Sequence, residues 1–305
     1  MTTVSFVTVD VFTSERFAGN QLAVIPDARG LTDRQMQAIA TEFGYSEATF
    51  VLPPDDPENT ARVRIFTPTT EVPFAGHPNV GTAFVLGRQS EIFDKLPGDH
   101  LRFEEKAGLV EVALLRQDSV VTGASIVAPQ QLAVGPIIDT ATIAACASLR
   151  PESVSDRCHA PVRISVGLPF AVAEILDVET LAAARPNVSA FDEANARYPL
   201  AEDSFSLFLY TRTQQQPWQI RARMFAPLDN VIEDPATGSA CAALGAYLVS
   251  LLPDADAEIE LTIEQGVEMG RRSLIAVAVS KQGGSIRKVG VSGDCVAVMR
   301  GSIEV

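Results

Sequence analysis

Two stretches far apart in this chain of 305 residues have nearly the same order of residue types. Each contains a strand-like Arg-x-Phe segment, a turn with proline, and then an apolar run rich in Gly, Thr or Ser at its start. The first stretch covers residues 64–83 and the second covers residues 223–240. If Gly81-Thr82-Ala83 corresponds to Gly238-Ser239-Ala240, the two halves of the protein are diverged copies of one folding unit.

The repeated stretch places one helix start in each half of the chain. A helix begins with N–H groups that have no partner within the helix, and it carries about half a positive charge there. We expect the two helix starts to face each other across a cleft between two domains. Together they would form a site for a small carboxylate.

The chain length and the internal repeat predict two domains, residues 1–125 and 126–305, with a last strand near 292–305 that returns to the first domain. Short strand patterns dominate, and each half has one strongly apolar helix. We therefore predict a mixed α/β fold, in which each domain is a curved, largely antiparallel sheet around a central apolar helix. The predicted helices cover residues 32–43, 80–86, 140–149 and 239–252.

Composition excludes several classes of partner. The net charge of -14 and the pI near 4.7 argue against nucleic acid and anionic membranes, so an anionic ligand would have to be held by local dipoles. The chain opens directly on a strand pattern without a signal segment, which predicts a cytoplasmic protein. The four cysteines lack metal-ligand spacing, and no glycine-rich nucleotide motif is present, so we expect neither a metal nor a cofactor.

Three residues of the first half are candidates for chemistry. His77 lies between Gly76 and Pro78 at a helix start, where glycine lets the backbone approach a ligand. Glu47 begins an apolar strand, and partial burial there would raise its pKa toward the range useful for proton transfer. Asn20 is a turn residue that could hydrogen-bond a ligand. The alternatives are a histidine that stabilises local structure and a solvated glutamate.

The second half offers a matching group at its own helix start. Asp234 precedes Thr237-Gly238-Ser239, so its carboxylate could accept a proton or orient a neighbour. Each of these residues could instead be an ordinary N-terminal cap, and only the repeated motif favours a functional role. Glu233 is expected to be exposed.

The residues resemble the PhzF-like family, named for an isomerase of phenazine biosynthesis, which shares the fold of diaminopimelate epimerase. The matching motifs run along the whole chain. They are residues 9–13, 17–20, 22–24, 46–51, 64–68, 73–78 and 81–83 in the first half, and residues 233–240, 265–266, 269–271 and 291–293 in the second.

The resemblance implies an isomerase that moves a hydrogen within a small carboxylated, cyclic amino acid without a metal or organic cofactor. Glu47 would be the general acid and base. His77, Asp234 and Ser239 would occupy the other catalytic positions, with Asn20 and Thr237 among the substrate-binding residues. Backbone N–H groups at Gly76-His77 and Gly238-Ser239 would hold the carboxylate, and the protein would form a homodimer.

Two other functions stay open from the sequence. Related epimerases use a cysteine at each helix start, but the corresponding stretches here are Ala75-Gly76-His77 and Pro235-Ala236-Thr237. One alternative is therefore an amino-acid epimerase or racemase that uses Glu47 with Asp234 or His77 as its second base. The other is a non-catalytic protein that binds small carboxylates.

Overall fold

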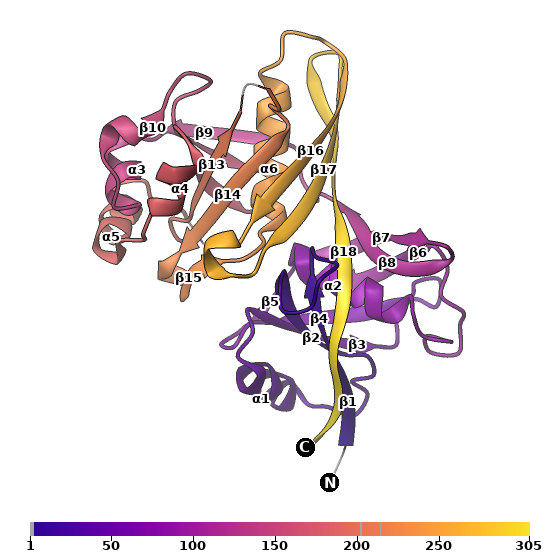
Figure 1. Cartoon of the computed structure of the whole chain (residues 1–305). Helices are drawn as coiled ribbons and strands as arrows, with labels where there is room; N and C mark the ends of the chain where they lie inside the picture. The colour runs from indigo at the N-terminus through magenta and orange to yellow at the C-terminus, as the bar shows by residue number, and fades with distance from the viewer. Residues whose placement is uncertain (1–2, 202, 214) are drawn as a thin grey trace. The chain divides into compact units, whose positions relative to one another are not determined.

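The computed structural model describes residues 3–201, 203–213 and 215–305. Contacts between residues divide the chain into two compact units. Unit 1 contains residues 1–127 and 292–305, and unit 2 contains residues 128–291. Figure 1 shows the elements of both units, with the long last strand, β18 (Ser285–Glu304), drawn in yellow.

Unit 1 consists of strands around one helix, with a second helix outside. Its elements are β1 (Thr3–Val11), β2 (Asn20–Ile25), α1 (Asp33–Phe43), β3 (Glu47–Leu52), β4 (Ala61–Phe66), β5 (Glu71–Val72), α2 (Gly76–Leu86), β6 (His100–Glu105), β7 (Gly108–Gln117), β8 (Val120–Val127) and the end of β18.

Unit 2 also consists of strands and one buried apolar helix, and it has more additional helices than unit 1. Its elements are β9 (Ala133–Ile137), α3 (Thr140–Cys146), β10 (Val154–Ser155), β11 (Val162–Ser165), β12 (Pro169–Ile175), α4 (Val178–Ala183), α5 (Val188–Arg197), β13 (Leu207–Arg212), β14 (Gln219–Ala226), β15 (Val231–Asp234), α6 (Gly238–Ser250), β16 (Ala257–Gln265) and β17 (Ser273–Gln282). Short 3₁₀ turns cover Pro151–Ser153, Pro227–Asp229 and Val267–Met269.

The strands of unit 1 form a closed ring. β1 is antiparallel to β18 and β2, β2 is parallel to β3, β3 is antiparallel to β4, and β4 is parallel to β6. β7 is antiparallel to β6 and β8, and β8 pairs with β18, which closes the ring. Every residue of α2 from His77 to Leu86 is buried, and Figure 1 shows this helix among the strands of unit 1. A closed sheet suits α2 because this helix has no polar face to turn toward water.

Unit 2 repeats the strand pairing of unit 1. β11 is antiparallel to β12, β12 is parallel to β13, β13 is antiparallel to β14, β14 is parallel to β16, and β16 is antiparallel to β17. The buried helix α6 follows a short antiparallel strand, β15, as α2 follows β5. The sheets and their central apolar helices confirm the predicted mixed α/β fold.

The Arg-x-Phe segments of the two repeats make the same contacts. Arg64 in β4 donates from Nε and Nη2 to the two carboxylate oxygens of Glu71, each at 2.8 Å. Arg223 in β14 donates from the same two nitrogens to Glu233, also at 2.8 Å. Each guanidinium lies over the ring of the phenylalanine two positions later, 5.1 Å and 4.9 Å from its centroid. The expectation that Glu233 is exposed is wrong, because this ion pair leaves its side chain only 14% exposed.

The helix starts differ from the sequence prediction in one half. α2 begins at Gly76 instead of residue 80, so Gly81 lies within the helix, whereas Gly238 is the first residue of α6. The match of Gly81-Thr82-Ala83 with Gly238-Ser239-Ala240 is therefore wrong, and Gly76-His77 has the position that corresponds to Gly238-Ser239. The helix starts before residue 80 because Gly76, His77 and Pro78 already form its first turn, where proline is well tolerated.

The predicted first helix is confirmed together with both of its ends. Thr32 caps α1 in a capping box with Gln35, and Gly44 ends the helix in the left-handed conformation at φ 63°. No helix of the described residues is long and apolar enough to cross a membrane.

The junction between β8 and β18 generates a prediction. A Cβ atom added to Gly123 would lie 2.0 Å from the carbonyl oxygen of Gly293 and 2.8 Å from Cα of Asp294, so the backbone of β18 would have to move. We expect Gly123→Ala to lower the free energy of unfolding by about 3 kcal/mol, the upper end of typical overpacking costs. Urea unfolding checks this prediction. Gly98→Ala is the control, because its added Cβ atom would lie 3.6 Å from the nearest atom, the carbonyl oxygen of His100, which is an ordinary contact. Equal midpoints for the two variants would contradict the prediction.

Candidate functional site

The candidate residues form two groups, one in each unit. In unit 1, Asn20 is the first residue of β2, Glu47 is the first residue of β3, and His77 is the second residue of α2. β2 and β3 run parallel, with Leu22 opposite Glu47, so the two strands start at the same end of the sheet. This end brings together three polar side chains that lie 27 to 57 residues apart in the sequence.

A chain of polar contacts links these side chains. Ser46 Oγ donates to Asn20 Oδ1 at 3.3 Å, and Asn20 Nδ2 lies 3.5 Å from His77 Nδ1. Because an amide nitrogen only donates, this contact makes Nδ1 the acceptor and assigns the proton of a neutral His77 to Nε2. His77 Nε2 lies 3.4 Å from Oε2 of Glu47. The N–H group is therefore on the ring atom nearer to Glu47, although the two atoms are not aligned for a hydrogen bond. Ser46 was not singled out by the sequence analysis.

Glu47 carries the strongest chemical signal of this group. Its side chain is 19% exposed, and Oε2 is buried without a hydrogen bond of good geometry to any residue that the structure describes. Burial raises the pKa of Glu47 to about 7, although a hydrogen bond with Ser46 acts in the opposite direction. Near neutral pH, this carboxyl group exists in both protonated and ionised forms, which a residue that takes and returns a proton requires.

A second buried carboxyl group, on strand β6, lies beside Asn79 of α2. Glu105, at the end of β6, interacts with Asn79, whose Nδ2 donates to the carbonyl oxygen of Ala75 at 3.1 Å. Both carboxylate oxygens of Glu105, and Oδ1 of Asn79, are buried without a hydrogen-bond partner among the described residues. Burial raises the pKa of Glu105 to about 8. A protonated Glu105 adds an O–H donor beside the amide group of Asn79.

The sequence contains a signal for Glu105 that the sequence analysis did not use. Leu101, Phe103 and Glu105 alternate along β6, and the first two are buried. Because successive side chains of a strand point to opposite faces, the carboxyl group belongs to the same buried face.

The unit 2 group is organised by a buried glutamine. Thr237 Oγ1 donates to Asp234 Oδ2 at 2.5 Å. Gln265 is fully buried; its Nε2 donates to the carbonyl oxygen of Asp234 at 2.7 Å and to Thr237 Oγ1 at 3.0 Å, and its Oε1 accepts from Thr237 N at 3.1 Å. Gln265 thus fixes the segment that leads into α6. It was noted only as part of a family motif, because its partners lie about thirty residues away.

The remaining predicted residues of unit 2 lie in the first turn of α6. Gly238 is the first residue of this helix and Ser239, which is partly exposed, is the second. Cys241 follows within the same turn, but burial raises the pKa of its thiol well above the ordinary value. The cost of desolvating a thiolate therefore exceeds any gain from the helix dipole, and the thiol stays protonated. Among the residues that the structure describes, no cluster of three potential metal ligands occurs.

Comparisons with known proteins agree with this architecture. The family model of phenazine biosynthesis-like proteins matches residues 9–301. An uncharacterised isomerase of Mesorhizobium japonicum is 37% identical over 309 residues, which cover 99% of each chain. The trans-2,3-dihydro-3-hydroxyanthranilate isomerase of Pseudomonas aeruginosa is 35% identical over 302 residues, 97% of this chain and 98% of that protein.

A solved structure extends the agreement to the fold. A PhzF-family protein of Bacillus anthracis superposes with a TM-score of 0.88 at 24% identity, and the match covers 100% of both chains. The chain belongs to the phenazine biosynthesis-like family of isomerases, which confirms the resemblance found in the sequence.

The raised pKa of Glu105 predicts that the protein becomes less stable as the pH rises. Between pH 4.5 and about 8, folded Glu105 keeps a proton that the unfolded chain has lost, so the free energy of unfolding falls as the pH rises. We expect Glu105→Gln to remove this contribution, so that the variant gains up to about 1.4 kcal/mol on the wild type for each pH unit in this range.

Urea unfolding at pH 5, 6 and 7 checks this prediction. Glu111→Gln, on the neighbouring strand β7, is the matched control because Glu111 is exposed. A constant difference between Glu105→Gln and the wild type at the three pH values would contradict a protonated Glu105.

Proposed function

We propose that this protein is an isomerase that moves a proton within a small, cyclic, carboxylated metabolite, with Glu47 as the general acid and base. One observation carries the proposal: a buried carboxyl group with a pKa raised to about 7 lies 3.4 Å from His77 Nε2. A group with this pKa can take a proton from one ring carbon and return it to another at neutral pH.

The proposed reaction is balanced without a cofactor. Ionised Glu47 removes a proton from a carbon atom of the substrate, and the electron pair left behind is delocalised into the adjacent unsaturated system. Neutral Glu47 then gives the same proton to a second carbon, which shifts the double bond and restores the carboxylate. His77, donating through Nε2, orients the Glu47 carboxyl group or the substrate at each stage.

The start of α2 supports a role in holding the carboxylate of the substrate. The residue before the helix, Ala75, provides no side-chain cap, so the positive end of the helix dipole near Gly76 and His77 favours an anionic ligand. A protonated Glu105 adds no negative charge near this helix turn, whereas an ionised one would repel a carboxylate.

We extend the proposal to the unit 2 group. Thr237 likewise provides no side-chain cap for α6, so the N–H groups of Gly238 and Ser239 are candidates for carboxylate binding, and Asp234 and Ser239 for contacts with the substrate. The name of the relative from Pseudomonas aeruginosa supports a cyclic substrate. Assembly as a homodimer stays a prediction from the family resemblance.

The role of Glu47 can be tested by an isosteric substitution. We expect Glu47→Gln to fold normally and to lower turnover about 10²–10⁴-fold or more, because the amide cannot carry a proton. The measurement is NMR in D₂O with a panel of small cyclic carboxylates, including trans-2,3-dihydro-3-hydroxyanthranilate, following conversion and deuterium incorporation. Glu42→Gln is the matched control, since Glu42 is exposed on α1. Retained turnover in Glu47→Gln would exclude the assigned role.

The pH profile tests the same residue independently. Because the first step requires ionised Glu47, we expect kcat/KM to rise with pH up to about 7 and then to level off. The Ser46 hydroxyl lowers the pKa of Glu47 when it donates its one hydrogen to this carboxylate instead of to Asn20 Oδ1, so Ser46→Ala should move the inflection to higher pH. A profile that is flat between pH 5 and 8, or an inflection that moves downward in Ser46→Ala, would contradict the proposal.

A further inference from the structure

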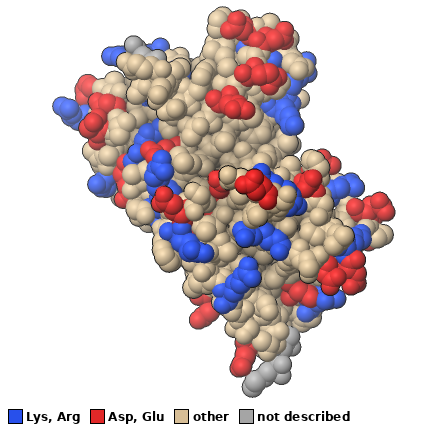
Figure 2. All heavy atoms as spheres, turned by 45° about the vertical axis from the view of Figure 1, so that its right-hand side comes forward, with Lys and Arg blue, Asp and Glu red and all other residues tan. Residues whose placement is uncertain are grey.

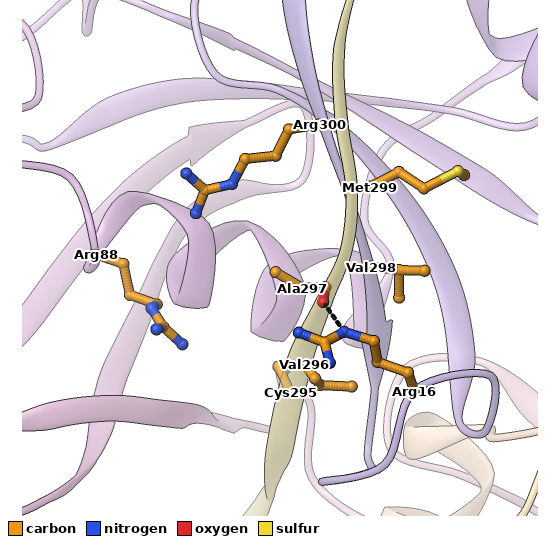
Figure 3. A pocket seen from close by; sticks show the side chains of 8 residues that line it. All are labelled: Arg16, Arg88, Cys295, Val296, Ala297, Val298, Met299 and Arg300. Carbon is orange, nitrogen blue, oxygen red and sulfur yellow. Dashed lines mark hydrogen bonds between the residues drawn. The ribbon is translucent and has the colours of Figure 1, made fainter.

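Three arginines surround a hollow on unit 1. The hollow has a volume of about 340 Å³, and its lining contains no Asp or Glu. It is lined by Arg16, Arg88, Arg300 and residues 295–299 of β18. Figure 3 shows Arg88 and Arg300 on the same side of β18, while the guanidinium group of Arg16 reaches the strand at Ala297. A second hollow of about 320 Å³ also has Arg88, Ala297 and Arg300 in its lining.

These arginines make no direct ion pairs among the described residues, and the acidic residue in the two linings is Glu91, in the second hollow. By contrast, Arg29, Arg62, Arg64 and Arg116 of the same unit each contact a carboxylate. Figure 2 shows basic side chains on the visible face of unit 1, although the chain has a net charge of -14. Because like charges repel one another, three guanidinium groups around one hollow favour a bound anion.

Two of the three guanidinium groups are held in place by contacts that leave donors available. Arg16 donates from Nε to the carbonyl oxygen of Ala297 at 2.9 Å, which leaves its two terminal nitrogens for a ligand. Arg88 lies over the ring of Phe84, 4.9 Å from the centroid, and this contact uses the face of the guanidinium instead of its N–H groups. Held side chains lose less conformational entropy when a ligand binds.

We propose that Arg16, Arg88 and Arg300 form a binding site for the phosphate group of a small molecule. The planar arginine fork matches the oxygens of a phosphate, and several such forks accommodate a doubly charged group. The volume suits a small molecule, and Val298 and Met299 offer apolar surface to an organic part of the ligand.

This site is separate from the group around Glu47. Arg88 follows the C-terminal end of α2, whereas His77 lies in its first turn, and neither hollow has Glu47 or His77 in its lining. The inference therefore goes beyond the proposed isomerase and does not depend on it.

The experiment is an isothermal calorimetric titration of the full chain with inorganic diphosphate and, separately, with phenyl phosphate. The methyl resonance of Met299, assigned with Met299→Leu, reports binding at the hollow by NMR. We expect saturable binding that weakens as NaCl is added, a shift of the Met299 signal, and an affinity about tenfold lower in Arg88→Gln and in Arg300→Gln. Arg34→Gln is the matched control, because Arg34 is exposed on α1 of the same unit.

The outcomes distinguish the two classes of phosphate ligand, and they also include results that would overturn the proposal. Tighter binding of phenyl phosphate assigns the site to an organic phosphate ester, and tighter binding of diphosphate assigns it to an inorganic anion; either supports a phosphate site. No saturation with either probe, or equal weakening by Arg34→Gln, overturns it. So does a change of oligomeric state without a change in affinity in Arg88→Gln and Arg300→Gln, because the arginines would then serve contacts between copies.

Discussion

The enclosure of an apolar helix is the constraint on which unit 1 depends. α2 has no polar face, so its buried stretch, His77 to Leu86, requires strands on several sides, and the sheet closes into a ring around it. The same enclosure determines the chemistry of the helix start. Polar groups of the first turn and of the neighbouring strands are removed from water together, where charges are costly and hydrogen bonds must be found within the protein.

This environment explains why unit 1 contains two carboxyl groups with raised pKa values. Glu47 and Glu105 both lie against α2, yet their surroundings differ. Glu47 has Ser46 and the ring nitrogen of His77 close by, whereas Glu105 has a single amide. The first is suited to exchange a proton near neutral pH, and the second to keep one. A fold selected for stability alone would contain neither, because each buried acid makes the folded state less favourable as the pH rises.

Local patterns predicted the parts of the fold that local physics determines. Thr32 and Gly44 define both ends of α1 because caps act within one turn of the helix. The predictions for Glu47 and His77 came from their positions beside apolar runs and from the family resemblance. The contacts of Ser46 and Gln265 were not predicted, because they join segments brought together only by the sheet. The ion pair of Glu233 was missed for the same reason, and the start of α2 was predicted four residues too late although Pro78 fits a first turn. For Glu105, the alternation along β6 indicates burial, but its partner Asn79 lies on a different element.

The pairing of β18 with β1 has a consequence for synthesis. β1 is synthesised before the other described strands, but the strand segment that pairs with it, residues 295–304, is synthesised after all of them. Unit 2 is contiguous, between residues 128 and 291, so its sheet can be completed earlier. The N-terminal unit therefore finishes folding after the C-terminal one, the reverse of the usual order for a growing chain. Until residues 295–304 emerge, the nascent protein carries an open strand edge at β1.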